Sequence, residues 1–203
     1  MRSETLTRRR SLRLLCVGLA FAGVSSLGLG GCGGGCNGEQ GPAVAEPVTV
    51  YVVRHAEKEV AAEGPDAVAA KDPALSREGQ VRALGLAEAV PVRDIKAIYV
   101  TKTKRSEDTA AAVAAVSGVE PTHYPPTNYA AIVERLRRDP GSSVLLVGHS
   151  NTIPPLLEAL GVKEKVTLSE SQYGDLWVVV ANSDGTAIME HRRFGDDVEK
   201  PGQ

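Results

Sequence analysis

Short runs of apolar and β-branched residues recur along the middle of this chain, and stretches with helical spacing separate them. The first run is V-T-V-Y-V-V at residues 48–53, and similar runs occupy residues 97–100 and 143–147. Runs of this length are typical of strands buried in a sheet. Because helical stretches lie between them, the pattern predicts a three-layer α/β/α sandwich whose central sheet is mainly parallel.

The helical stretches have recognisable starts and inner faces. Ser76 precedes the first stretch, where we expect it to act as the N-cap with Glu78 in the first turn. We expect Leu84, Leu86 and Ala87 to form the buried face of this helix. The remaining helices are expected at residues 104–116, 129–138 and 152–160.

The last part of the domain has the pattern of an antiparallel hairpin. Residues 175–181 and 187–191 are strand-like, and the N-S-D-G sequence at residues 182–185 favours a tight turn between them. A short strand is also expected at residues 122–124, just before two prolines. The hairpin is expected to add an antiparallel edge to the parallel sheet.

The first 31 residues follow a different pattern. Four arginines, at positions 8, 9, 10 and 13, precede an apolar run over residues 14–29 that is short for a membrane span. A basic segment, an apolar segment and then small residues are typical of an export signal. The segment ends in L-G-G-C at residues 29–32, which resembles the lipobox of bacterial lipoproteins. This resemblance implies that Cys32 becomes the lipidated first residue of the mature protein.

A lipidated Cys32 implies an exported protein anchored to a membrane, on the periplasmic or cell-surface side. Two or more acyl chains hold a protein stably there, since each buried methylene contributes about 0.8 kcal/mol. An ordinary cleaved signal and an uncleaved anchor are the alternatives. The R-R-S-L-R sequence at residues 9–13 also resembles a twin-arginine signal, so the sequence leaves the export route open.

Removal of the signal changes the charge and the cysteine content. The full chain has 23 basic and 25 acidic residues; residues 1–31 hold five arginines and one glutamate, so the mature chain has 18 basic and 24 acidic residues, a net charge of −6. An acidic domain argues against a nucleic-acid partner. Cys16 leaves with the signal, and Cys36 is then alone beside a lipidated Cys32, which excludes a disulfide framework. Without lipidation, Cys32 and Cys36 could form a local bridge.

Composition divides the mature chain into three parts. Residues 32–46 are rich in Gly, Pro and Ala without apolar periodicity, which predicts a flexible tether. The globular domain is expected over residues 47–195, about 150 residues, which is enough to bury a core. Residues 196–203 form a C-terminal tail.

Chemically distinctive residues follow three of the expected strands. Arg54 and His55 come directly after the first, Arg105 lies in the helix that follows the second, and His149 comes directly after the third. The carboxyl ends of parallel strands meet at one edge of a sheet, where ligands bind. Guanidiniums grip phosphate oxygens bidentately, and neutral imidazole is a nucleophile. The arrangement therefore predicts a phosphoryl pocket in which the two guanidiniums lower the pKa of His55.

These residues belong to motifs that occur in a fixed order: R-H-A-E at residues 54–57, T-x-x-x-R at residues 101–105 and G-H-S at residues 148–150. Together the motifs resemble the histidine phosphatase superfamily, which has the phosphoglycerate-mutase-like fold. The resemblance implies that His55 is the nucleophile and forms a phosphohistidine intermediate. It also implies that Arg54, Arg105 and His149 hold the phosphoryl group, and that no cofactor takes part.

The family resemblance implies a metal-independent phosphatase for a small phosphomonoester or related phosphoryl substrate. Lys58 is a further candidate phosphate ligand. Hydrolysis is favoured over mutase activity, because relatives with mutase activity carry longer insertions over the pocket and this compact domain is expected to lack them. A metal site built from His55, His149 and Glu57 is disfavoured because the adjacent arginines would repel a cation. Substrate choice is expected to depend on the loops at residues 60–73 and 124–129.

Two positions depart from the family pattern. Ala56 replaces the usual glycine, and residues 125–129 lack the acid with which many members protonate the leaving group. Glu57 is the nearest candidate proton donor, and Glu134 is the next. If neither serves, the site suits leaving groups that need little protonation. The alternative function is a catalytically inactive member of the fold that binds a phosphorylated ligand.

Overall fold

The computed structural model describes residues 46–60 and 72–195. The predicted signal peptide, Cys32, nearly all of the tether, most of the loop at residues 60–73 and the C-terminal tail lie outside the described residues. Within the described ranges, no helix has the length and apolar character that a membrane crossing needs.

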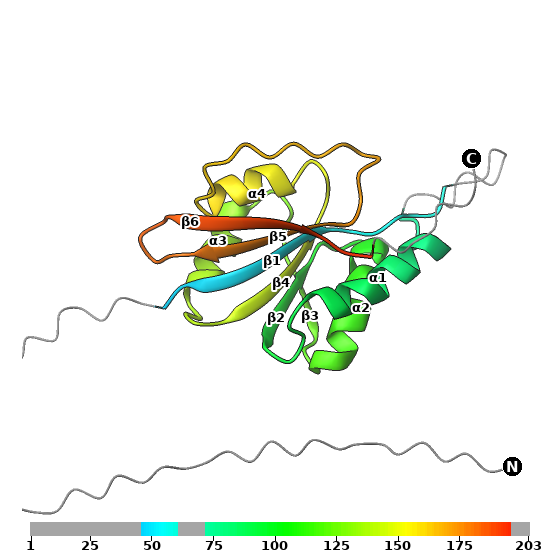
Figure 1. The fold of residues 1–203 in the computed structure, drawn as a ribbon, viewed down its shortest axis with the longest axis horizontal. Helices are drawn as coiled ribbons and strands as arrows, with labels where there is room; N and C mark the ends of the chain where they lie inside the picture. The colour runs from blue at the N-terminus through cyan, green and yellow to red at the C-terminus, as the bar shows by residue number, and fades with distance from the viewer. Residues whose placement is uncertain (1–45, 61–71, 196–203) are drawn as a thin grey trace, which may run out of the picture. The chain divides into compact units, whose positions relative to one another are not determined.

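The described residues form a six-stranded sheet with the order β3-β2-β4-β1-β5-β6 (Figure 1). The strands are β1 (Val48–Arg54), β2 (Ile95–Val100), β3 (Pro121–His123), β4 (Ser143–Gly148), β5 (Asp175–Ala181) and β6 (Ala187–Arg193). Strand β1 pairs in parallel with β4, and β2 pairs in parallel with both β4 and β3. Strands β5 and β6 form the antiparallel hairpin, with β5 against β1. This arrangement confirms the predicted fold class.

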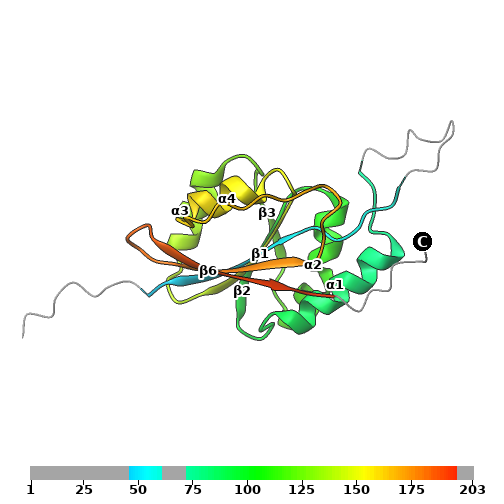
Figure 2. The same cartoon turned by 45° about the horizontal axis from the view of Figure 1, so that its top comes forward.

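Helices cover both faces of the sheet, as Figure 2 shows. They are α1 (Arg77–Ala89), α2 (Lys104–Ser117), α3 (Tyr129–Arg137) and α4 (Ile153–Ala159). The alternation of side chains along β1 explains the two layers: Val50 and Val52 pack with α3 and α4, while Tyr51 and Val53 pack with α1 and α2. Each fully buried apolar side chain of this kind contributes about 1.5–3 kcal/mol.

Helix α1 begins as the sequence predicts but turns a different face inward. The Ser76 side chain accepts a hydrogen bond from the Gly79 N–H at 3.2 Å, which confirms the N-cap. Leu86 is buried, whereas Leu84 is 62% exposed, so its predicted place on the inner face is wrong. The buried positions are spaced by three or four residues and include a charged one: Gly79, Arg82, Ala83 and Leu86. Because Arg82 faces inward, the buried face of α1 is not the one that the hydrophobic residues alone indicate.

Candidate active site

His55 and His149 directly follow two neighbouring strands, β1 and β4. Arg54, the last residue of β1, lies opposite Gly148, the last residue of β4, in the parallel register. The His55 N–H donates a hydrogen bond to the Gly148 carbonyl at 3.0 Å, so the chain continues side by side beyond the strands. As a result the imidazoles of His55 and His149 lie with centroids 5.1 Å apart and planes inclined by 63°. The expected meeting of these residues at one edge of the sheet is therefore present.

The ring of His55 is oriented as a nucleophile requires. Its Nδ1 lies 2.8 Å from the carbonyl oxygen of Ala56, so Nδ1–H donates and Nε2 keeps its lone pair. The residue is only 4% exposed. Burial is the main cause that lowers the pKa of His55 to about 3, and the charges of Arg54 and Arg105 act in the same direction. The imidazole is therefore neutral at physiological pH.

Helix α2 supports the loop that carries His55. The Ala56 N–H donates to the Thr109 hydroxyl at 2.9 Å, and this hydroxyl donates in turn to the Arg105 carbonyl at 2.6 Å. Thr109 is fully buried. One threonine thus links the backbone next to His55 with the backbone of Arg105, two positions that are far apart in sequence.

Arg54 is held by the loop that precedes β5. Its Nη1 donates to the carbonyls of Ser169 and Gln172, each at 2.9 Å. Its guanidinium carbon lies 4.2 Å from the centroid of the Tyr173 ring, a cation–π contact. The Arg54 Nε is buried and has no hydrogen-bond partner within the described part of the chain. The sequence around Tyr173, Y-G-D-L at residues 173–176, also resembles the histidine phosphatase superfamily, but it does not indicate that Tyr173 contacts an arginine 119 residues away.

Arg105 and His149 are the second arginine and the second histidine of the site, and the charge of Arg105 acts on both imidazoles. The Nε of Arg105 is also buried without a partner among the described residues, and its Nη1 is 3.4 Å from Asp72. The Nε2 of His149 is 2.9 Å from the hydroxyl of Thr101. Burial, followed by the charge of Arg105, lowers the pKa of His149 to about 4. The described part of the site therefore combines two neutral imidazoles with two cations whose buried Nε groups have no acceptor within it.

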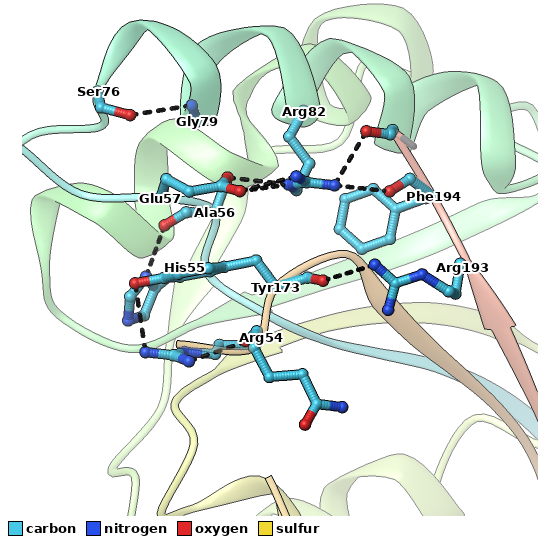
Figure 3. Close-up of polar contacts among 12 residues, drawn as sticks. Arg54, His55, Ala56, Glu57, Ser76, Gly79, Arg82, Tyr173, Arg193 and Phe194 are labelled. Atoms are coloured by element: carbon cyan, nitrogen blue, oxygen red, sulfur yellow. Dashed lines mark hydrogen bonds and ion pairs between the residues drawn. The ribbon is translucent and has the colours of Figure 1, made fainter. Parts of the chain in front are cut away.

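Glu57 has a partner that the sequence did not reveal. Both of its oxygens accept hydrogen bonds from the Arg82 Nε, at 2.8 and 2.9 Å, and the Arg82 Nη2 forms an ion pair with it at 2.7 Å (Figure 3). The Arg82 Nη1 donates to the carbonyls of Phe194 and Gly195. Glu57 is therefore anchored to helix α1, and its role as proton donor stays a prediction. The pairing favours a structural role.

A close backbone approach adds to this anchor. A Cβ atom on Gly79 would overlap the carbonyl oxygen of Glu57, so only glycine lets the first turn of α1 pack against this loop. The Ser76 N–H donates to the same carbonyl at 2.9 Å. Glu57 is thus fixed both by its backbone carbonyl, which contacts the start of α1, and by its side chain, which pairs with Arg82.

The remaining predicted residues lie outside this cluster. Lys58 is exposed and lines a hollow of about 580 Å³ whose wall includes Tyr173. Glu134 is exposed and forms an ion pair with Arg138 on α3. A second hollow, of about 370 Å³, extends from His149 along the start of the loop at residues 124–129. Among the described residues, no group of three or more His, Cys, Asp or Glu has a metal-binding arrangement.

Comparisons with known proteins agree with the fold. The model of the histidine phosphatase superfamily (branch 1) matches residues 50–126. No curated protein sequence matches the chain. Among solved structures, the protein histidine phosphatase SixA complexed with tungstate aligns with a TM-score of 0.57 and 16% identity, over 74% of this chain and 99% of that chain.

Other solved structures share the fold at similarly low identity. A phosphoglycerate mutase from Bacillus anthracis aligns with a TM-score of 0.55 and 18% identity, over 75% of this chain and 94% of that chain. A mycobacterial glucosyl-3-phosphoglycerate phosphatase aligns with a TM-score of 0.54 and 13% identity, over 74% of this chain and 99% of that chain. Over residues 50–126 the chain is therefore similar in sequence to branch 1 of the histidine phosphatase superfamily, and it shares its fold with these solved structures.

Proposed function

We propose that this protein is a metal-independent phosphatase that hydrolyses a small phosphomonoester, or a related phosphoryl substrate, through a phosphohistidine intermediate on His55. The observation that carries the proposal is the neutral, oriented imidazole of His55 near two guanidiniums whose buried Nε groups have no acceptor among the described residues. The similarity of residues 50–126 to the histidine phosphatase superfamily supports the reaction class.

The reaction proceeds in two balanced steps. The Nε2 lone pair of His55 attacks phosphorus while the bond to the leaving oxygen breaks, and that oxygen takes up a proton. Water then attacks the phosphohistidine, the P–N bond breaks and phosphate is released. Arg54, Arg105 and His149 stabilise the phosphoryl oxygens in both steps, and each charge-assisted hydrogen bond contributes about 1.5–3 kcal/mol. Lys58 remains a candidate for an outer contact with the substrate.

A second candidate function rests on a specific observation. Glu57, the nearest candidate proton donor, is engaged by Arg82 through both of its oxygens. A site without a proton donor would still bind a phosphorylated ligand. The alternative is therefore a catalytically inactive member of the fold that binds such a ligand.

One assay separates these functions. The full-length protein, purified in detergent, is assayed with p-nitrophenyl phosphate with and without EDTA, beside His55→Ala and the control His123→Gln. His123 is a suitable control because it is half-exposed and pairs with Glu107 at the surface. Turnover that survives EDTA and disappears only in His55→Ala supports the phosphatase. Absent turnover with retained phosphate binding supports the binding protein, and turnover that EDTA abolishes would implicate a metal.

The intermediate itself is open to direct detection. Acid quenching destroys phosphohistidine, whereas alkaline quenching preserves it, so peptides from an alkaline quench are suited to mass spectrometry. We expect a phosphoryl group on the peptide that contains His55. Multiple turnovers without a phosphorylated peptide in rapid-quench samples would refute the covalent route.

We further propose that the protein is exported and anchored to a membrane by a lipid on Cys32. The basic, apolar and small-residue segments before L-G-G-C support this proposal. An extracytoplasmic location favours a small phosphorylated substrate over a phosphorylated signalling protein. The mass of the mature N-terminal peptide tests the anchor: a diacylated or triacylated Cys32 is expected, and an unmodified N-terminus would refute it.

A further inference from the structure

We propose that Tyr173 is a ligand of the transferred phosphoryl group: its hydroxyl and the Nε–Nη2 edge of Arg54 together bind two phosphoryl oxygens. This inference rests on the proposed function, because it adds a residue to the same site. Four observations lead to it: a comparison of two arginines, the unused donor of Tyr173, the rigidity of its loop, and its distance from His55.

Arg54 and Arg82 are held in the same way on one side and differ on the other. In each, Nη1 donates to two backbone carbonyls, which are Ser169 and Gln172 for Arg54 and Phe194 and Gly195 for Arg82. The Nε–Nη2 edge of Arg82 is occupied by a carboxylate. The matching edge of Arg54 has a buried Nε without a described partner. A planar guanidinium edge of this kind binds a pair of oxygens bidentately, so the open edge fits an oxyanion.

The Tyr173 hydroxyl lies near that open edge. It lies 3.5 Å from the Arg54 Nη2, which donates towards it. No described residue accepts the proton of this hydroxyl, so its donor capacity is unused. Figure 3 shows the hydroxyl end of Tyr173 beside the guanidinium of Arg54 and next to the imidazole of His55. An oxygen bound at the open edge of Arg54 would therefore lie within reach of a second, neutral donor.

The loop that carries Tyr173 is fixed in place. The Tyr173 carbonyl accepts a hydrogen bond from the Arg193 Nη2 at 3.1 Å. Gly174 has a φ of +81°, and a Cβ there would lie 2.6 Å from the Arg82 Nη1. The Gln172 side chain donates to the buried Asp175 carboxylate at 2.9 Å. Contacts on both sides of Tyr173 thus hold the ring under Arg54, and a donor held in this way needs little reordering when the ligand binds.

The position of the ring favours a contact with phosphoryl oxygens over a proton transfer to the leaving group. The Tyr173 and His55 ring centroids are 6.1 Å apart, and the hydroxyl lies beside the cation that is expected to grip those oxygens. In an in-line displacement, the leaving group lies opposite the nucleophile and the transferred oxygens lie around the middle. A ligand of these oxygens contributes equally whatever the leaving group, whereas a proton donor matters most for a basic one.

The test is Tyr173→Phe, which removes the hydroxyl and keeps the ring stacked against the guanidinium of Arg54. Tyr51→Phe is the matched control, because Tyr51 lies within β1 and packs among the apolar side chains on the sheet face that α1 and α2 cover. The affinity for inorganic phosphate and for tungstate is measured by calorimetry, in the wild-type background and in His55→Ala. The kcat/KM is measured with p-nitrophenyl phosphate and with an alkyl phosphate, and thermal unfolding reports folding of each variant.

We expect Tyr173→Phe to weaken anion binding and to lower kcat/KM for both substrates by a similar factor, about 10- to 100-fold, the size of one hydrogen bond to a charged group. Unchanged anion affinity and kcat/KM would overturn the proposal and leave Tyr173 as packing for Arg54. A loss confined to the alkyl phosphate would overturn it in favour of a proton donor. Failure of the wild-type protein to bind either anion would overturn this inference and the proposed function together. If Tyr173→Phe weakens anion binding but His55→Ala leaves turnover unaffected, the proposed role of His55 is refuted and the inference about Tyr173 stands.

Discussion

The ion pair between Glu57 and Arg82 gives a quantitative prediction about stability. Arg82→Met removes a guanidinium whose side chain is only 10% exposed, and it leaves a carboxylate that is 22% exposed without its partner. The change also removes the donors for the carbonyls of Phe194 and Gly195. The methionine keeps most of the length of the buried stem, so the effect reports the lost charge and hydrogen bonds.

The expected magnitude follows from the burial of the pair. Removing one partner of a buried ion pair costs about 3–5 kcal/mol, because the other charge is left uncompensated. Water has some access to Glu57, so we expect a loss near 3 kcal/mol in the free energy of unfolding. For a domain of this size, each kcal/mol shifts the Tm by about 2–4 °C, which predicts a decrease of about 6–12 °C.

Urea titration and calorimetry of four variants provide the measurement. They are Arg82→Met, Glu57→Leu, the double variant, and Arg77→Met, a control at an exposed position of the same helix. We expect the double variant to be more stable than Arg82→Met, because an apolar pair leaves no isolated charge. If Arg82→Met loses less than about 1 kcal/mol, as the exposed control should, the reasoning about the buried pair is refuted.

Three further predictions concern the site. Because the pKa values of His55 and His149 are lowered to about 3 and about 4, the unfolded chain binds protons that the folded chain does not as the pH falls below about 6.5. The free energy of unfolding should therefore decrease as the pH falls from about 6.5 towards these lowered pKa values, by up to about 1.4 kcal/mol per pH unit for each histidine. Urea titrations at several pH values should give a shallower dependence of this free energy on pH for His149→Gln than for the wild type. Equal slopes would contradict the lowered pKa of His149. Thr109→Val should cost about 1–3 kcal/mol and lower kcat by leaving the Ala56 N–H without an acceptor, while Thr109→Ser should restore both, and equal behaviour of the two variants would exclude the hydroxyl. Glu57→Gln should reduce kcat on an alkyl phosphate by less than about 10-fold per folded molecule, whereas a loss of about 100-fold or more would identify Glu57 as the general acid.

The sequence predicted the fold and the meeting of the two histidines because both depend on regular rules. Strand runs, helix starts and the hairpin turn are local patterns, and the carboxyl ends of parallel strands share one edge of a sheet. The 5.1 Å separation of the His55 and His149 rings follows from that edge. The bounds of the elements differ from expectation mainly at their ends, as in β2, which begins at Ile95 and not at residue 97.

Long-range polar pairs could not be predicted in the same way. The sequence analysis assigned no role to Arg82, because nothing local shows that a carboxylate 25 residues earlier would meet it. The same reasoning placed Leu84 inside, although the helix turns Arg82 and Ala83 inward. The contact of Tyr173 with Arg54 could not be predicted either, since it depends on how an irregular loop folds back. Glu57 shows the consequence: a residue that suited the role of proton donor by sequence lies in an ion pair.

The antiparallel direction of β5 determines when this site can exist. Because β5 runs against β1, the segment that leads into β5 reaches the edge where the parallel strands end, and it brings the carbonyls that hold Arg54. A chain synthesised or translocated only as far as residue 168 would contain every motif of the pocket and yet lack the support of its first arginine. The phosphatase activity proposed for this protein should therefore begin only when nearly the whole chain has been delivered, and a measured activity of this kind would report the completion of folding.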